Sequence, residues 1–196
     1  MKPLSIVNYP HPALRWKSKP IIEIDRRLRD VVEQMFALMY EAKGVGLAAN
    51  QVALPWRLFV INPTGDPEET DQEFAFLNPE IIRRKGSVEG EEGCLSLPGL
   101  YMPVRRSDII SIEAFDLDGA AFRMDLDDYD ARIIQHEFDH IEGALFIDRL
   151  TDEKREESAP RLLALEQEFR DSQKSGEVAD DETLIQQLRS LEPTGS

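Results

Sequence analysis

The chain has 196 residues, 41% of them hydrophobic, which is enough to bury the core of one generous domain or of a domain with a tail. Its 38 acidic and 23 basic residues give a net charge of −15, so we expect poor affinity for nucleic-acid phosphates. No run approaches the ~20 apolar residues of a membrane span, and the first residues lack a signal-peptide pattern. The single cysteine, Cys94, excludes an internal disulfide. We therefore expect a cytoplasmic protein with no membrane partner and no direct sequence-specific binding of nucleic acid.

The first predicted element is an amphipathic helix over residues 24–42, where apolar side chains recur near the helical period. It is expected to end before Gly44. Strand-like runs follow at 57–61, 73–77 and 109–115, each closed by turn-forming residues, and their spacing favours antiparallel pairing.

A second helix is predicted to begin at Asp127 or Asp128 and to end at Gly143. A highly charged third helix is predicted over 151–173. Residues 174–196 are acidic and weakly periodic, which is typical of a weakly structured tail with one weak helical turn around residues 184–191. We expect this tail to be dispensable for chemistry.

Two of the three histidines lie on the second predicted helix, within the stretch QHEFDHIEG. Residues four apart on a helix share a face, so His136 and His140 can reach one metal ion with Glu137 beside it. Two surface histidines on an acidic helix are the alternative interpretation of this stretch.

The only thiol, Cys94, lies in EEGCLSLPG, between glycines that allow the backbone to approach closely. A thiolate with two imidazoles leaves a fourth metal position for water, as in catalytic sites, whereas an inert buried cysteine is the simpler alternative.

The stretch GVGLAANQV, residues 44–52, is rich in small residues that suit close packing against another element or an extended ligand. It lacks the Gly-Lys-Ser/Thr ending of a phosphate-binding loop.

Taken together and in this order, GVGLAANQV, EGCLSLPG and QHEFDHIEG resemble the three signature motifs of the peptide deformylases. These enzymes remove the formyl group from N-formylmethionine at the start of nascent bacterial and organellar proteins. The resemblance implies an α+β fold, with antiparallel strands packed around a central HExxH helix, an N-terminal helix and a charged C-terminal helix. It also implies a deformylase-like catalytic domain over 1–150, followed by a helix over 151–173 and the acidic, weakly structured tail over 174–196.

The same resemblance implies a metal-dependent hydrolase that releases formate. Its metal ligands would be Cys94, His136 and His140, holding one divalent ion, usually Fe²⁺, which Zn²⁺, Ni²⁺ or Co²⁺ could replace. Glu137 would act as general acid and base, while the oxyanion would be stabilised by the side-chain amide of Gln51 and the backbone N–H of Leu95.

Substrate contacts are also implied by the resemblance. Gly46 would contact the substrate through its backbone, and the candidates for the methionine pocket are Val45, Tyr129 and Ile133. A salt bridge between Asp139 and Arg106 is expected beside the ligands. The partners would be N-formylmethionyl nascent peptides. The ribosome is a further candidate, though not through a basic C-terminal helix, because residues 151–196 hold about twice as many acidic as basic side chains.

Two other classes of protein could carry such a helix. A zinc endopeptidase also uses HExxH, but it usually takes its third ligand downstream, and Glu142 lies too close to serve. A binding module that keeps a metal only for stability would have no use for the general base. One feature departs from many bacterial deformylases, since Leu100-Tyr101 stands where they carry a basic residue.

Overall fold

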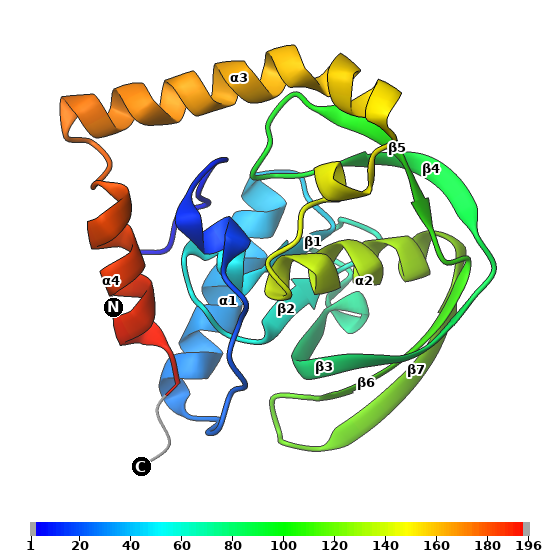
Figure 1. Cartoon of the computed structure of the whole chain (residues 1–196). Helices are drawn as coiled ribbons and strands as arrows, with labels where there is room; N and C mark the ends of the chain where they lie inside the picture. The colour runs from blue at the N-terminus through cyan, green and yellow to red at the C-terminus, as the bar shows by residue number, and fades with distance from the viewer. Residues whose placement is uncertain (1–2, 194–196) are drawn as a thin grey trace.

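Two antiparallel sheets enclose a central helix in the computed structural model of the protein, which describes residues 3–193 (Figure 1). The helices are α1 (Arg26–Glu41), α2 (Asp128–Ile141), α3 (Asp152–Ser175) and α4 (Asp181–Leu191). The strands are β1 (Gly46–Ala48), β2 (Leu58–Ile61), β3 (Phe74–Lys85), β4 (Val88–Gly93), β5 (Tyr101–Arg106), β6 (Ile109–Phe115) and β7 (Ala121–Asp127). The predicted α+β class is confirmed. Within the described residues, none of the helices combines the length and apolarity that crossing a bilayer requires.

The larger sheet has five strands in the order β1-β2-β3-β6-β7, and the smaller one pairs β4 with β5. All pairs are antiparallel, as expected from the spacing of the strand-like runs. Strand β6 has the predicted bounds, whereas β3 continues far beyond residue 77, because the chain resumes pairing with β6 after a register shift. Strand β4, VEGEEG, escaped prediction because glycine and glutamate are poor strand formers.

Helix α2 lies between the sheets and is buried on most of its surface (Figure 1). Its apolar side packs against the larger sheet, where Ile134 joins a core cluster with Phe59 and Phe76. The helix starts at Asp128 with Asp127 as its N-cap residue, although the Asp127 side chain makes no capping hydrogen bond. Gly143 follows the helix with φ 77°, and a Cβ there would lie 2.7 Å from the carbonyl oxygen of Arg15. Both the turn and the close approach therefore require glycine at this position.

The C-terminal part of the chain differs from the expected weakly structured tail. After the long helix α3, α4 folds back along the N-terminal segment (Figure 1). Leu184 and Leu188 are buried, and two tryptophans hold the end of the helix: Trp56 Nε1 donates to the Leu191 carbonyl at 2.7 Å, and Trp16 Nε1 to Glu192 Oε1 at 3.0 Å. The expected single weak turn is instead a helix over residues 181–191, which Asp180 caps by accepting from the N–H of Thr183. The expectation of a weakly structured tail was wrong for these residues, because packing and hydrogen bonds with residues more than a hundred positions away stabilise a helix whose local pattern is short. The division into three domains stays a prediction, and residues 194–196 of the tail lie outside the described residues.

Leu188→Ala tests the docking of α4. Removing a buried leucine side chain leaves a cavity, so we expect the free energy of unfolding to fall by about 2–5 kcal/mol in denaturant titrations. Gln186→Ala, at an exposed position of the same helix, is the control and should change stability by less than about 0.5 kcal/mol. Equal effects of the two substitutions would contradict a docked α4.

Candidate active site

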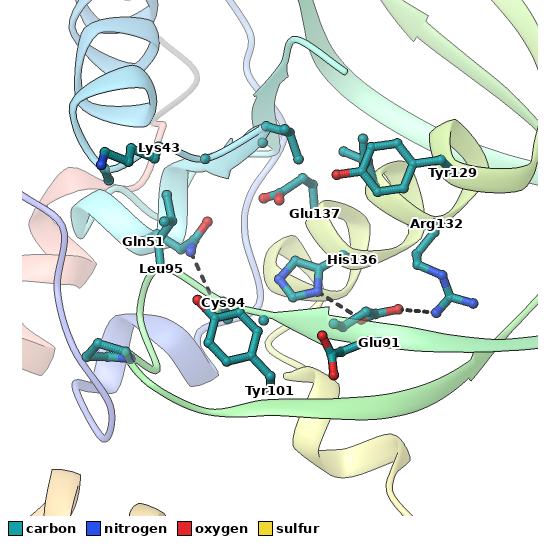
Figure 2. Close-up of a pocket in the computed structure, with 18 of the residues that line it drawn as sticks. Lys43, Gln51, Glu91, Cys94, Leu95, Tyr101, Tyr129, Arg132, His136 and Glu137 are labelled. Atoms are coloured by element: carbon teal, nitrogen blue, oxygen red, sulfur yellow. Dashed lines mark hydrogen bonds and ion pairs between the residues drawn. The ribbon is translucent and has the colours of Figure 1, made fainter. Parts of the chain in front are cut away.

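The three sequence motifs meet in one cleft of about 630 Å³ (Figure 2). The connection from α1 into β1 forms one wall, the end of β4 with the following loop forms another, and α2 forms the floor. Of the predicted site residues, nine line the cleft: Val45, Gly46, Gln51, Cys94, Leu95, Tyr129, Ile133, His136 and Glu137. The tenth, His140, lies one turn of α2 deeper and is 1% exposed.

Cys94, His136 and His140 form a compact group of metal-ligating side chains. Their donor atoms all lie within 4.8 Å of one another, and Cys94 Sγ is 3.3 Å from His140 Nε2. The two histidines come from successive turns of α2, while the thiol comes from the loop that leaves β4. The helical period thus sets the spacing of two donors, and the position of β4 beside α2 brings the third.

A buried carboxylate orients the first histidine. His136 Nδ1 lies 3.0 Å from Glu92 Oε2, and Glu92 also accepts hydrogen bonds from the buried guanidinium groups of Arg106 and Arg132. Burial raises the pKa of Glu92, but the hydrogen bonds from Arg106 and His136 outweigh this effect and hold it well below its usual range. An ionised carboxylate only accepts, so Nδ1 of His136 carries the proton and Nε2 faces Cys94.

The sequence motifs did not indicate that Glu92 or Arg132 belongs to the site. Arg132, on α2, also donates to the carbonyls of Val88 and Val104, and so it fastens the helix to the β4–β5 pair. Nothing in the local sequence separates Glu92 from its neighbour Glu91, which is exposed. The predicted ion pair between Arg106 and Asp139 is confirmed, and Arg149 is a second partner of that carboxylate.

The pKa values of the two histidines are shifted in opposite directions. Burial lowers the pKa of His136, but its hydrogen bonds to Cys94 and Glu92 outweigh burial and raise it to about 10. Burial, together with the nearby charge of His136, holds the pKa of His140 well below its ordinary value, so this ring is neutral. A cysteine sulfur and two imidazoles, one of them fixed by a carboxylate, are a donor set that zinc and iron sites use. The residues therefore fit a bound metal.

Glu137 points into the cleft beside this group, from the turn of α2 that carries His136 (Figure 2). Its Oε2 is buried and has no hydrogen-bond partner within residues 3–193. Burial raises the pKa of Glu137 to about 7, and the charge of Glu92 acts in the same direction. A Cβ added to Gly46 would lie 2.5 Å from Glu137 Oε1, so the carboxylate fits only because β1 presents a glycine there.

Gln51 faces Glu137 across the cleft with its amide group held in one orientation. Its Oε1 accepts from the backbone N–H of Ala48 at 2.8 Å, and therefore its Nε2 is directed at Cys94 Sγ, at 3.5 Å, and at Ser96 Oγ, at 3.3 Å. The side chain is 1% exposed. An amide donor fixed beside a metal group is the arrangement expected of a polar group that receives developing negative charge.

Comparison with known proteins agrees with this geometry. The family model described as polypeptide deformylase matches residues 3–156. The chain belongs to this family. The peptide deformylase of Rhodopirellula baltica is 45% identical over 185 residues, which cover 94% of this chain and 92% of that protein. The chloroplastic/mitochondrial peptide deformylase 1B of Arabidopsis thaliana is 44% identical over 168 residues, 85% of this chain and 61% of that protein.

Solved deformylase structures share the fold. A plant peptide deformylase of the 1B type superposes with a TM-score of 0.84 at 43% identity, covering 90% of this chain and 95% of the other. The enzyme from Plasmodium falciparum gives a TM-score of 0.83 at 38% identity, covering 86% and 98%. The chain is thus a deformylase, a hydrolase that removes the N-formyl group from newly made polypeptides, and its family is metal-dependent.

The deformylase cleft has further walls that the motifs did not indicate. Tyr101 is 65% exposed, and its ring lies against Gly93, where a Cβ would be 2.5 Å from the ring carbon. Tyr129 is 54% exposed, and its ring and that of Tyr101 stand on different sides of the opening (Figure 2). Lys43, with φ 57°, adds a cation at the rim. The departure at Leu100-Tyr101 therefore places an aromatic ring in the cleft.

Gly46→Ala tests how closely Glu137 must approach β1. The new Cβ would displace the carboxylate, so we expect kcat for formate release to fall about 10²-fold, the loss associated with a misplacement of about 1 Å. Bound metal, measured by elemental analysis, should stay at the wild-type level, since the atoms nearest to the added methyl group all belong to Glu137. Wild-type turnover would show that Glu137 can move aside without loss.

Proposed function

We propose that Cys94 Sγ and the Nε2 atoms of His136 and His140 hold one divalent ion per chain, and that this ion is Fe²⁺, with Zn²⁺, Ni²⁺ or Co²⁺ as working substitutes. Support comes from the 4.8 Å limit on the separations of the donors and from the carboxylate that fixes the His136 ring. A divalent ion held by three such donors lowers the pKa of a bound water towards neutrality and polarises a carbonyl group.

Glu137 is the proton carrier in this proposal. The buried Oε2, which lacks a hydrogen-bond partner among residues 3–193, is the observation that carries it, because an unpaired buried carboxylate oxygen is costly unless it serves a ligand. Glu137 takes a proton from the attacking water and later gives a proton to the departing amine, which leaves formate and a free α-amino group. The wall formed by Gly46 keeps the carboxylate in the cleft.

Two donors stabilise the negative charge that develops on the formyl oxygen. Gln51 offers Nε2–H, held in direction by the bond from Ala48 to its Oε1. Leu95 offers its backbone N–H, for which no acceptor occurs within the described part of the chain. Donors positioned before reaction need no reorganisation, and one such donor is worth about 10²–10³ in kcat.

The methionine side chain enters the apolar part of the cleft formed by Val45, Tyr129 and Ile133, and the backbone of Gly46 contacts the substrate. These residues supply apolar area and no charge, which suits an unbranched thioether side chain. N-formylmethionyl nascent peptides are therefore the substrates.

If the ribosome is a partner, it is not contacted through a basic C-terminal helix, because the first turns of α3 and α4 are acidic. A cytoplasmic location stays a prediction of the sequence.

Formate release from a short N-formylmethionyl peptide, measured under anaerobic conditions with iron-loaded protein, tests the proposal. The same peptide without the formyl group should remain intact. Cleavage of an internal peptide bond in either substrate would favour the endopeptidase instead. Two results would support the proposed ion. Activity should return when Fe²⁺ is added to protein whose metal a chelator has removed, and protein loaded with Ni²⁺ or Zn²⁺ should keep its activity in air.

Glu137→Gln should keep the metal and lose nearly all turnover. The amide has the same shape but cannot carry the proton, so we expect kcat to fall about 10²–10⁴-fold while metal content is unchanged. Elemental analysis and formate release on the same samples provide the measurement. Near-normal activity with bound metal would remove Glu137 from the mechanism.

Cys94→Ser should weaken metal binding, because a neutral hydroxyl replaces the charged thiolate that a bound metal holds deprotonated. Competition with a chelator under anaerobic conditions measures the affinity, and formate release should fall with the bound metal. A serine variant that binds metal as tightly as the wild type and deformylates as fast would mean that Cys94 is not a ligand.

A further inference from the structure

A second cavity, of about 140 Å³, lies against another face of α2 from the catalytic cleft. The cleft is lined by His136 and Glu137, whereas this cavity is lined by Gln135 and Asp139, which the helical period turns to a different side. Four arginines from three separate parts of the chain line it: Arg84 from β3, Arg105 and Arg106 from the end of β5, and Arg149 from the short 3₁₀ helix Phe146–Arg149.

The cavity carries an excess of positive charge. Its lining contains four guanidinium groups and one carboxylate, that of Asp139. This carboxylate is already paired with Arg106 and Arg149. Arg84 and Arg105 form no hydrogen bond or ion pair with any side chain in the span 3–193, and Arg84 only lies 5.8 Å from the ring centroid of Phe138. Arg105 lies opposite Glu89 across the β4–β5 pair, but the Glu89 carboxylate is paired with Lys154. Among the described residues, Arg84 and Arg105 are thus the two cations of the cavity that have no carboxylate within ion-pair distance.

The crowding has an electrostatic cost. Partial burial lowers the pKa of Arg84, Asp139 acts against this, and the charges of Arg149 and Arg106 lower it further. The group stays protonated at neutral pH, so the repulsion is not relieved by loss of a proton. An anion in the cavity would relieve it, and the planar guanidinium fork matches the spacing of phosphate and carboxylate oxygens.

We propose that this arginine pocket binds a phosphate group. A phosphate presents three or four oxygens around a tetrahedral centre and close to two negative charges at neutral pH, so it can meet guanidinium groups that converge from several directions. A carboxylate offers two oxygens in one plane and a single charge. The phosphate belongs either to a small molecule, such as inorganic phosphate, or to the backbone of an RNA strand. The net charge of −15 disfavours non-specific binding of RNA, so an RNA phosphate would be bound at this basic pocket rather than over the acidic surface as a whole. Both sources offer the same oxygens to Arg84 and Arg105.

The pocket is separate from the deformylase chemistry but is connected to it through charged side chains. Arg106 donates both to Asp139 at the pocket and to Glu92, which fixes the ring of His136. Because Arg84 and Arg105 are outside that chain of contacts, they can be changed without removing a contact of the metal group. They are therefore the positions at which the proposal is tested.

Calorimetric titration of metal-loaded protein with inorganic phosphate, in chloride buffer at constant ionic strength, is the first experiment. We expect one saturable site, and a loss of affinity of about tenfold or more in Arg84→Gln and in Arg105→Gln, as for a lost hydrogen bond to a charged group. Arg83→Gln is the matched control. Arg83 is the neighbouring residue of β3 and is exposed as Arg84 is, but it does not line the cavity, so this variant loses the same charge and should bind phosphate as the wild type does. Metal content and unfolding temperature establish that each variant is folded.

A short single-stranded RNA, titrated into the same proteins, distinguishes the two sources. Binding that is tighter than that of inorganic phosphate and is weakened by Arg84→Gln supports an RNA backbone as the source, whereas phosphate binding that RNA does not displace supports a small molecule. The proposal is overturned if neither ligand binds saturably up to about 10 mM, or if Arg84→Gln and Arg83→Gln behave alike. Acetate that binds as tightly as phosphate would also overturn it, because the pocket would then not select phosphate.

Discussion

The site depends on one buried carboxylate, Glu92, at the end of β4. An ionised carboxylate in the interior is costly unless it is fully hydrogen-bonded, and Glu92 is paired with Arg106 from β5, Arg132 from α2 and the ring of His136. These bonds join the smaller sheet to the central helix and at the same time fix which nitrogen of His136 faces the thiol. The interaction that holds the two layers together therefore also sets the orientation of His136 within the candidate metal group Cys94, His136 and His140.

Close packing between β1 and α2 supplies the second constraint. A carboxylate can stand beside the histidines only because Gly46 has no side chain, and the carboxylate in turn has a buried oxygen left for a ligand. On the other side of the helix the same α2 backbone carries Asp139, whose charge is used to pair Arg106 and Arg149. One helix thus presents a buried carboxylate, Glu137, to the cleft and a charge-pairing carboxylate, Asp139, to the arginine pocket, on faces separated by the helical period.

The C-terminal helices extend the molecule beyond the sheets. α3 is anchored at the cysteine loop, where Arg161 donates to the Pro98 carbonyl, and α4 packs on the N-terminal segment. That N-terminal segment is itself bonded to the catalytic loops, since the backbone N–H of Val7 donates to Gln51 and that of Tyr9 to Ser96. α4 therefore packs against the segment that is bonded to the Gln51 and Ser96 side of the cleft.

The amino-acid sequence by itself determined the family, the reaction class and most of the helices and strands that were predicted. The HExxH period on α2, the lone thiol between glycines and the small-residue stretch before Gln51 are local patterns, and local spacing is sufficient to read them. Only the tertiary structure decided which of two adjacent glutamates, Glu91 or Glu92, accepts the hydrogen bond from the ring of His136. The choice depends on which face of β4 meets α2. The tertiary structure also decided that residues 181–191 form a docked helix and that Arg84, Arg105 and Arg149 converge, since each of these outcomes joins residues far apart in the chain. Long-range pairing leaves no periodic signal in a single sequence, and for that reason these features appear only once the chain is folded.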